Sequence, residues 1–273
     1  QNVYSQLGDG TSDSRLDPVR VGTDADWGWI SAGGLHTCAV KTGGELWCWG
    51  SNQYGQLGDG STTTRSVPTR AGPDADWAKV WAGRYHTCAI KTTGTLWCWG
   101  RNDQGQLGDN STLGRSSPAQ AGTAVDWSSV SPGDMHTCAL KTGGTLWCWG
   151  DDASQQLGNG TAEGDKPVPT QTGTEADWAS VDGGVFHTCA VKSGGSLWCW
   201  GMKNGQLGDG TLTQRSDPTR IGTDSGWASV TTDEWHTCGL RTDGSLWCWG
   251  RNTFGELGNG LAWELMPVPV VRP

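Results

Sequence analysis

The segment His36-Thr-Cys-Ala-Val-Lys-Thr-Gly-Gly-Glu-Leu-Trp-Cys-Trp-Gly50 decides the fold. It contains two short runs of strand-forming residues on either side of a Gly-rich turn, which is the pattern of a β-hairpin. If Lys41 pairs with Glu45 across a Thr-Gly-Gly loop, the antiparallel register places Cys38 directly opposite Cys48, close enough to bridge. The segment therefore predicts a hairpin closed by a disulfide.

The same hairpin signal occurs five times, and each copy carries two cysteines ten positions apart. We predict one disulfide in each hairpin, with the pairs Cys38–Cys48, Cys88–Cys98, Cys138–Cys148, Cys189–Cys199 and Cys238–Cys248. Persistent disulfides are typical of an oxidising compartment, so we expect a secreted or extracellular protein, with the periplasm or a cell surface as further locations. The alternative is a reduced protein that uses Cys and His as metal ligands. Because the short C-x2-C spacing of zinc sites is missing, we predict no metal site.

The hairpin is part of a unit of about 50 residues that repeats along the whole chain. Each unit contains a Gln-Leu-Gly turn, a Pro-containing strand such as Pro18-Val-Arg-Val, an Asp-Trp-x-x-Val strand and the two hairpin strands. Four strands per unit at this period predict the four-stranded blades of a β-propeller, an all-β fold. The predicted units, within a single domain of residues 1–273, are 1–50, 51–100, 101–150, 151–201, 202–250 and a partial 251–273.

The two ends of the chain are redundant, since residues 1–23 and 251–273 duplicate the same half unit. Five complete hairpins therefore accompany six turns and six Pro-containing strands. We favour five blades, and the alternative is a ring of six or seven positions that another segment or molecule closes. A spare edge strand can pair with a neighbouring chain, which predicts head-to-tail self-association through the terminal strands. Prolines at the start of the first strand fit an outer sheet edge.

Tryptophan is the packing residue of the repeat, with 19 Trp against two Phe and three Tyr. Trp47 and Trp49 point to one side of their strand and Cys48 to the other, so both faces of the hairpin need a buried environment. A blade between two neighbours provides it. The tryptophans outside the repeated positions are Trp29, Trp81, Trp235 and Trp263. The recurring His of each His-Thr-Cys triplet is interpreted as a hydrogen-bonded core residue, with a pH switch or a ligand as the alternative.

Charge and motifs exclude several classes of function. The net charge is -9, which disfavours nucleic acid and anionic lipid surfaces as partners. No apolar run reaches the roughly 18 residues that span a bilayer, so no membrane insertion is predicted. The chain begins at Gln1 rather than Met, which we interpret as a processed product. Because G-x-S-x-G, P-loop and H-E-x-x-H motifs are missing, we predict that the protein is not an enzyme and needs no cofactor.

The segment Trp49-Gly-Ser-Asn-Gln-Tyr-Gly-Gln-Leu-Gly58, followed by a proline and by Gly-x-x-His-Thr, resembles the repeat of the regulator of chromosome condensation family. The resemblance covers essentially the whole chain in several copies and implies a β-propeller. Proteins similar to this family include a nuclear exchange factor for a small GTPase, a plant ultraviolet-B photoreceptor and secreted bacterial inhibitors of β-lactamases, so the resemblance leaves function open. The cysteine pairs depart from the intracellular members and favour a secreted, disulfide-containing one.

Positions that differ between the units are the candidates for binding. The two residues before each His-Thr vary, as does the loop after each Trp-Gly, and we expect both at one rim of the propeller. By resemblance to the family, the corresponding loops bind partners. The candidate binding residues are Leu35, Tyr54, Arg84, Tyr85, Arg101, Asp134, Met135, Phe186, Glu234, Trp235, Arg251 and Phe254. Exposed Tyr, Trp, Met and Arg are the residue types that dominate binding hot spots. The alternative is a structural role, in which the apolar residues fill the central channel of the propeller.

We therefore predict a secreted module that recognises an extracellular protein, another macromolecule or a glycan. One asymmetric macromolecular partner is favoured because the rim differs from blade to blade. A lectin-like carbohydrate-binding propeller is the alternative, and the family resemblance leaves room for a polysaccharide lyase that uses Tyr, His and Arg. The Asp-x-Asp pattern of Asp24 and Asp26 suits either calcium or a capped turn. Asn110 and Asn159 begin glycosylation sequons in a eukaryotic source.

Overall fold

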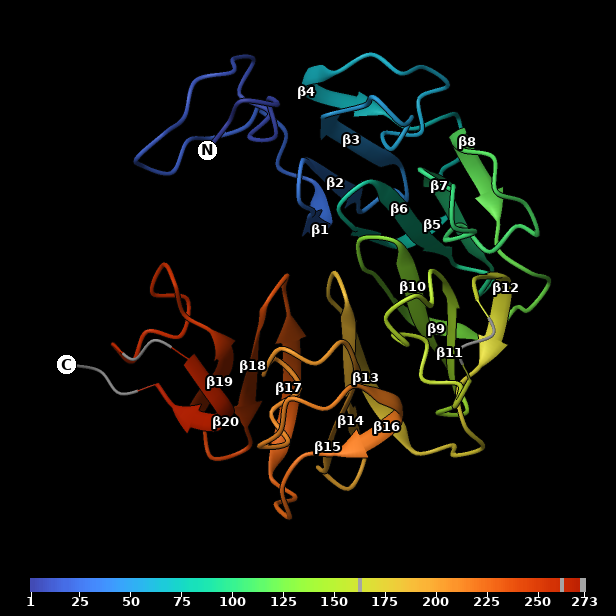
Figure 1. Ribbon diagram of the computed structural model, residues 1–273. Helices are drawn as coiled ribbons and strands as arrows, with labels where there is room; N and C mark the ends of the chain where they lie inside the picture. The colour runs from blue at the N-terminus through green and yellow to red at the C-terminus, as the bar shows by residue number, and fades with distance from the viewer. Residues whose placement is uncertain (162–163, 261–262, 271–273) are drawn as a thin grey trace. The chain divides into compact units, whose positions relative to one another are not determined.

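The fold is all-β. The computed structural model describes residues 1–161, 164–260 and 263–270, and every regular element within these ranges is a β-strand. The strands form five antiparallel sheets of four strands each, the blades of a β-propeller (Figure 1). The predicted fold class is therefore confirmed, with one disulfide in each blade. The described residues contain no helix that could span a membrane.

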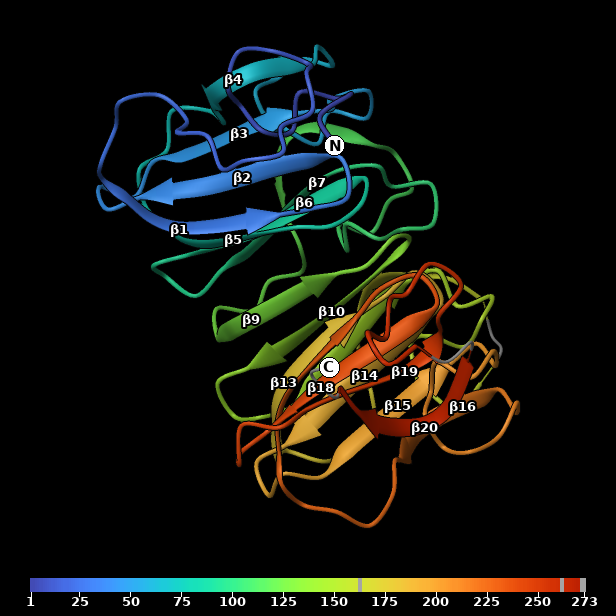
Figure 2. The same cartoon turned by 90° about the vertical axis from the view of Figure 1, so that its left-hand side faces the viewer.

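Each blade contains, in chain order, a strand that begins at a repeated tryptophan, the two hairpin strands and a Pro-containing strand. Figure 2 shows the strands of blade 1 side by side in this order, namely β1 (Trp27–Ala32), β2 (His36–Lys41), β3 (Leu46–Gly50) and β4 (Arg65–Arg70). Blade 2 comprises β5 (Trp77–Ala82), β6 (His86–Lys91), β7 (Leu96–Gly100) and β8 (Arg115–Gln120). Blade 3 comprises β9 (Trp127–Pro132), β10 (His136–Lys141), β11 (Leu146–Gly150) and β12 (Lys166–Gln171). Blade 4 comprises β13 (Trp178–Gly183), β14 (His187–Lys192), β15 (Leu197–Gly201) and β16 (Arg215–Arg220). Blade 5 comprises β17 (Trp227–Thr232), β18 (His236–Arg241), β19 (Leu246–Arg251) and β20 (Trp263–Pro269).

The chain divides into two compact units. Unit 1 comprises Gln1–Met135 with Pro167–Pro169, and unit 2 comprises His136–Lys166 with the chain from Thr170 onward. The predicted partial repeat 251–273 falls in unit 2, and its residues 261–262 and 271–273 lie outside the described residues.

The hairpin of blade 1 has the register that its sequence predicts. The Lys41 N–H donates to the Glu45 carbonyl at 2.9 Å, and Cys38 lies opposite Cys48, to which it is disulfide-bonded. The turn needs Gly44, whose φ of 87° strains any residue with a Cβ, and a Cβ there would also meet the Ala75 carbonyl. The other four hairpins repeat the cysteine pairing, so the five predicted disulfides are confirmed.

The hydrophobic core lies between consecutive blades. In unit 1, Val40, Leu46 and the disulfide of blade 1 pack against Trp77 and Trp99 of blade 2. These six side chains, the two cysteines included, are at most 3% exposed. Blade 1 thus presents its disulfide face to the tryptophan face of blade 2, where large aromatic rings are buried. The same packing recurs in unit 2 between blades 4 and 5, which confirms that the repeated tryptophans are packing residues.

Four of the five histidines are buried core residues, as predicted, and His236 is half-buried. His36 is fully buried, and its Nε2 lies 2.7 Å from Thr87 Oγ1, which itself donates to the Gln56 carbonyl at 2.7 Å. Because Thr87 has only one hydroxyl hydrogen, Nε2 of His36 carries the proton that joins them. In unit 2, His136 binds Thr188 at 2.9 Å in the same way.

Burial lowers the pKa values of three of these histidines. Desolvation lowers the pKa of His36 and of His136 to about 4, and that of His187 to about 3. A neutral imidazole is therefore the resting form of all three at neutral pH. Neither a pH switch near neutrality nor an exposed ligand fits residues that are buried and lock one blade to the next.

The Pro-containing strands differ from the prediction in two respects. First, such a strand pairs with the hairpin of the unit before it, as Thr69 of β4 pairs with Cys48 of β3, so it is the last strand of a blade rather than the first. Second, Pro68 lies inside β4 rather than at its start, where the pairing with β3 is irregular. The missing N–H of proline is tolerated there because β4 is the edge strand of the sheet.

This offset explains why the predicted strand at Pro18 does not form. Residues 18–21 have no strand geometry, whereas the equivalent segment Arg65–Arg70 pairs with the hairpin strand β3. The described residues therefore contain five Pro-containing strands rather than six, and β20 is paired within blade 5. Head-to-tail self-association through the terminal half units stays a prediction.

The N-terminal turn instead packs onto blade 1. The Gln6 carbonyl accepts hydrogen bonds from Thr37 Oγ1 at 2.9 Å and from Trp49 Nε1 at 3.0 Å. The Gln56 carbonyl receives the equivalent pair from blade 2. The first Gln-Leu-Gly turn thus covers the tryptophan face of blade 1 although it belongs to no blade.

Candidate binding surface

In blades 1, 2, 4 and 5 the two variable segments of the repeat lie side by side at one end of the blade. In blade 1 the Ser51 N–H donates to the Leu35 carbonyl at 3.0 Å. The equivalent bonds run from Arg101 to Tyr85, from Met202 to Phe186 and from Arg251 to Trp235, at 2.8 to 3.0 Å. In these four blades the residue before His-Thr is therefore held next to the loop after Trp-Gly, at the blade end where the hairpin begins and finishes. That the variable segments together form one binding rim stays a prediction.

Four of the candidate residues form one cluster in unit 1, named here the Tyr–Arg cluster: Tyr54, Arg84, Tyr85 and Arg101. The rings of Tyr54 and Tyr85 meet edge to face with centroids 5.4 Å apart. The Arg101 guanidinium lies 5.4 Å from the first ring and 5.5 Å from the second, and that of Arg84 lies 5.3 Å from Tyr85. Two loops and the turn before β6 thus bring together two aromatic rings and two cations.

Carboxylates hold the cations of the Tyr–Arg cluster in place. Arg101 donates two hydrogen bonds of 2.7 Å to the carboxylate of Asp103. This pairing lowers the pKa of Asp103 and raises that of Arg101. Arg84 lies 3.7 Å from the buried carboxylate of Asp134, another candidate residue. A bidentate pair fixes the plane of a guanidinium, so Arg101 is presented to the two tyrosines in one orientation.

The Tyr–Arg cluster is accessible from one side. Tyr54 is 37% exposed, and the Arg84 side chain is 40% exposed. Tyr85 is half-buried between them. The cluster therefore combines rigid aromatic area with surface that a partner can cover.

Unit 2 contains a second group of candidate residues. Phe186 and Trp235 stack with ring centroids 5.2 Å apart, which joins the ends of blades 4 and 5. The Arg251 guanidinium lies 5.7 Å from the ring of Phe254, whose side chain is 84% exposed. Glu234 is exposed beside Trp235. The backbone hydrogen bonds from Met202 to Phe186 and from Arg251 to Trp235 place these residues at the end of their blades where the hairpin begins, as Tyr85 is in blade 2.

Leu35 and Met135 are placed differently from the other candidates. Both are half-buried directly before their histidines. Within the described residues, the ring contacts and ion pairs of the Tyr–Arg cluster involve neither of them. The residue that sequence reasoning missed is Asp103, which follows Arg101 by two positions and pairs with it. An acidic residue at that spacing after a variable arginine was the available signal.

Two tryptophans outside the repeat pack strands rather than form a surface. Trp29 of β1 and Trp81 of β5 lie with ring centroids 5.7 Å apart, and the Trp29 Nε1 donates to the Val80 carbonyl at 2.8 Å. The ammonium of Lys79 lies 4.8 Å from the Trp29 ring. These contacts join the first strands of blades 1 and 2.

The two carboxylates of the Asp-x-Asp pattern form ion pairs with a lysine at the end of the blade away from the candidate binding residues. Lys41 Nζ lies 2.7 Å from Asp24 and 3.2 Å from Asp26, and it also faces the rings of Trp27 and Trp47 at 5.1 and 5.2 Å. The hydrogen bond that Lys41 donates to Asp24 is the main reason why the pKa of Lys41 is raised. The suggestion that these carboxylates contact calcium is replaced by this ion pair. Clusters of three or more metal-binding side chains are not found among the described residues.

Sequence comparison decides the family. The profile of the RCC1-like domain matches residues 1–272. The chain belongs to the RCC1-like domain family. The resemblance drawn from the Trp-Gly-x-Asn and Gln-Leu-Gly elements is confirmed by this match. A comparison with curated proteins gave no match.

Solved structures of RCC1-like proteins share the fold. Human WBSCR16 is 23% identical with a TM-score of 0.88, over 100% of this chain and 75% of that chain. Prp20p from Saccharomyces cerevisiae is 23% identical with a TM-score of 0.76, over 89% of this chain and 65% of that chain. The ectodomain of the Physcomitrella patens receptor kinase CR4 is 23% identical with a TM-score of 0.53, over 82% of this chain and 52% of that chain. This RCC1-like chain thus spans less than two thirds of the yeast and moss chains.

Proposed function

We propose that this RCC1-like protein is a secreted, non-enzymatic module that binds a protein partner through the Tyr–Arg cluster. RCC1-like propellers often mediate protein binding, and the structure of yeast Prp20p is described together with its binding to Gsp1p and histones. The proposal is based on the convergence of two aromatic rings and two guanidinium groups. The contacts that join Tyr54, Tyr85, Arg84 and Arg101 have lengths of 5.3 to 5.5 Å between ring centroids or from guanidinium to ring centroid.

The chemistry of the Tyr–Arg cluster suits a protein partner. Tyr and Arg are enriched among hot-spot residues because they combine apolar area with polar groups that find partners. The ion pair with Asp103 holds Arg101 before a partner arrives, which reduces the entropy lost on binding. Since Asp103 and Asp134 offset both guanidinium charges, the surface does not depend on a strongly acidic partner.

A single asymmetric partner fits better than a repeated sugar. The position before His-Thr is Leu35 in blade 1, Tyr85 in blade 2 and Trp235 in blade 5, so no common polar set recurs. Catalysis by a lyase-like Tyr, His and Arg set is disfavoured as well. The histidine nearest the Tyr–Arg cluster, His86, is 0% exposed, so it does not reach a ligand on the surface.

Secretion is supported by the disulfides. The chain contains five bridges, and nine of the ten cysteines are buried, which shields the bridges from reductants. Bridges of this number are rare in reducing compartments. Intact-mass measurement of protein purified without reductant tests this part of the proposal: five disulfides predict a gain of ten hydrogens on reduction.

The binding proposal is tested by affinity capture from the extracellular fluid of the source organism. Wild type is compared with Tyr54→Ala, Tyr85→Ala and a control, Val125→Ala. Val125 is 64% exposed and lies beside the hairpin turn of blade 2, at the end of the blade away from Tyr85. We expect one partner to be recovered by wild type and by the control and to be lost with both tyrosine variants.

Equal recovery with all four proteins would contradict the proposed surface. Folding of each variant is checked by its near-ultraviolet circular dichroism, which the tryptophan core dominates. A glycan array separates the lectin alternative: binding to one glycan that survives Tyr85→Ala and Trp235→Ala would favour carbohydrate recognition over a protein partner.

A further inference from the structure

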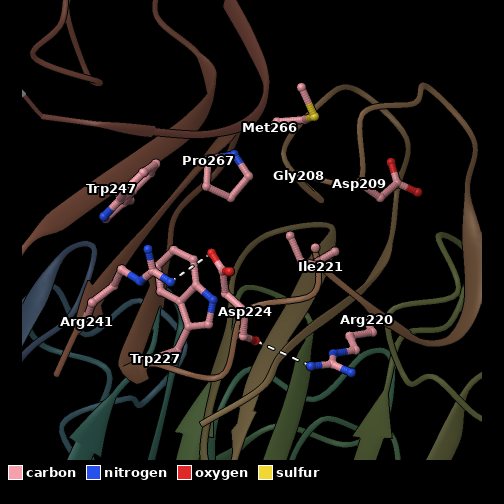
Figure 3. Close-up of a pocket in the computed structure, with 11 residues that line it drawn as sticks. Gly208, Asp209, Arg220, Ile221, Asp224, Trp227, Arg241, Trp247, Met266 and Pro267 are labelled. Atoms are coloured by element: carbon pink, nitrogen blue, oxygen red, sulfur yellow. Dashed lines mark hydrogen bonds and ion pairs between the residues drawn. The ribbon is translucent and has the colours of Figure 1, made fainter.

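A pocket of about 310 Å³ lies between blades 4 and 5 in unit 2. Its walls include Trp227, Trp247 and Arg241 of blade 5, together with Ile221 and Asp224 of the loop that leaves blade 4 (Figure 3). Arg241 ends β18, whereas His236 begins it next to Trp235, so the pocket is at the end of the blade away from the candidate binding residues. The volume lies at the lower end of the range for small-molecule sites.

A buried donor lines this pocket. Trp227 is 4% exposed, and its indole Nε1 has no hydrogen-bond partner among the described residues. Figure 3 shows the indole nitrogen on the side of the ring toward Asp224. An indole N–H can only donate, and leaving it buried without an acceptor is unfavourable. An acceptor atom of a bound molecule would satisfy it.

Arg241 in this pocket has fewer carboxylate partners than the lysine at the equivalent position of blade 2. In blade 2, Lys91 Nζ is paired with two carboxylates, Asp74 at 2.7 Å and Asp76 at 3.0 Å. In blade 5, arginine replaces this lysine and glycine replaces the second aspartate. Arg241 therefore pairs with Asp224 alone, at 2.7 Å, and its five-donor guanidinium keeps further N–H groups for a ligand.

The neighbouring charges reinforce this difference. Arg220 donates to the carbonyls of Thr223 and Asp224 at 2.8 and 3.5 Å, and Asp209 is paired with Arg215 at 2.6 Å. The lining of the pocket thus contains two arginines, Arg220 and Arg241, and two aspartates, Asp209 and Asp224. The lining of the equivalent pocket between blades 1 and 2 contains Asp59 and Asp74 but, among the described residues, no cationic side chain. Of these two pockets, the one between blades 4 and 5 therefore offers cations to a ligand.

The other walls of the pocket are apolar. Ile221 is 2% exposed, and Met266 and Pro267 of β20 face it across the opening in Figure 3. The corresponding positions at the junction of blades 1 and 2 are Ala71 and Ser117, in a pocket of about 190 Å³. The larger site therefore offers apolar contact on one side and donors on the other.

We propose that the pocket between blades 4 and 5 binds a small organic carboxylate with an apolar, ring-sized body. The carboxylate accepts from the Trp227 indole and from the Arg241 guanidinium, and the body packs against Ile221, Met266 and Pro267. Charge-assisted hydrogen bonds of this kind favour an anion over its neutral analogue. The site is separate from the Tyr–Arg cluster and does not depend on the function proposed for that cluster.

Benzoate is the probe, and benzyl alcohol is its neutral analogue. Titration is followed by nuclear magnetic resonance through the indole N–H signals, with the Trp227 signal assigned from Trp227→Phe. We expect benzoate to shift the Trp227 signal with saturation in the millimolar range, and benzyl alcohol to bind at least about tenfold more weakly.

The decisive variant is Gly226→Asp, which restores the carboxylate of the other repeats. A Cβ at Gly226 would lie 3.7 Å from Arg241 Nε, an ordinary contact, and the residue has no positive φ, so the fold accepts aspartate. The new carboxylate pairs with Arg241 and is expected to weaken benzoate binding about tenfold or more. Ser229→Asp is the control, because it adds the same charge at an exposed position of β17 outside the pocket.

The proposal is overturned if benzoate leaves the Trp227 signal unchanged, or if Gly226→Asp and Ser229→Asp weaken binding equally. Equal binding of benzoate and benzyl alcohol would likewise reject an anion site. Trp227→Phe provides a further check, since loss of the indole donor is expected to weaken benzoate binding about tenfold while the aromatic wall remains.

Discussion

The buried histidines predict that the protein loses stability in mild acid. His36, His136 and His187 are 0% exposed, and desolvation lowers their pKa values to about 4, 4 and 3 from the ordinary 6.5. The unfolded chain therefore binds protons more readily than the native state as the pH falls. The stabilising effect of burying a neutral histidine is complete above the unfolded pKa near 6.5 and is lost as the pH falls toward the folded pKa near 4.

The size of this effect follows from the two pKa values. At pH 5 a histidine with an unfolded pKa of 6.5 and a folded pKa of about 4 costs about 2 kcal/mol. The three histidines together cost about 5 to 6 kcal/mol on going from pH 7 to pH 5. That loss is a large part of the 5 to 15 kcal/mol that stabilises a typical domain.

His136→Gln isolates the contribution of one site. The glutamine amide can still donate to Thr188 Oγ1, the acceptor that lies 2.9 Å from His136 Nε2, but it does not titrate. Denaturant midpoints at pH 7, 6 and 5, read by tryptophan fluorescence with the disulfides intact, give the free energy of unfolding. We expect the variant to lose about 2 kcal/mol less than wild type between pH 7 and pH 5. Equal pH dependence of the two proteins would refute the reasoning.

Three further predictions concern stability. Burial raises the pKa of Asp152 from 3.8 to about 6, so the stability of the fold decreases as the pH rises between these two values. Asp152→Asn introduces the residue found at the equivalent position Asn52 and is expected to stabilise the fold at pH 7 by about 1 to 2 kcal/mol in urea unfolding. A destabilised variant would contradict this. Deletion of residues 1–14 uncovers Trp49, now 3% exposed, and is expected to lower the thermal midpoint by several degrees, whereas an unchanged midpoint would show that the N-terminal turn does not stabilise blade 1. Replacing Cys88 and Cys98 together by alanine is expected to cost about 2 to 3 kcal/mol in denaturant unfolding, and no loss would contradict a stabilising bridge.

The hairpins were predictable because their signals are local. The alternation of Trp47, Cys48 and Trp49 fixes which side chains share a face, and the Gly-containing turn fixes the register that joins Cys38 to Cys48. The alternation and the turn both lie within one segment of fifteen residues, so they could be interpreted without knowing how the blades pack together. The period of the repeat then gave the blades.

The assignment of the Pro-containing strands was less predictable, since it depends on pairing between units. The sequence places Pro18 and Pro68 in equivalent segments, but among the described residues only the second pairs with a hairpin. Strand geometry at such a segment is decided by its partner rather than by its own residues. Chain order alone therefore put this strand into the wrong blade.

The candidate surface was predictable in position but not in detail. Differences between units identified Tyr54, Tyr85 and Arg101, and backbone bonds place the variable segments together. The pairing of Arg101 with Asp103, which orients the guanidinium against the tyrosines, depends on the path of the loop. The loss of Asp-x-Asp at Gly226 was visible in the sequence, but its effect on Arg241 and the pocket required the structure.

The central claim is that the Tyr–Arg cluster is the surface that recognises a protein partner. Its most direct test is the dissociation constant of the captured partner for wild type, Tyr85→Ala and Val125→Ala, measured by titration calorimetry. Tyr85 contacts Tyr54, Arg84 and Arg101, so its truncation removes the centre of the cluster. We predict a loss of about 2 kcal/mol or more, roughly thirtyfold in affinity, for Tyr85→Ala and an unchanged constant for Val125→Ala. An affinity of Tyr85→Ala equal to that of wild type would contradict the account.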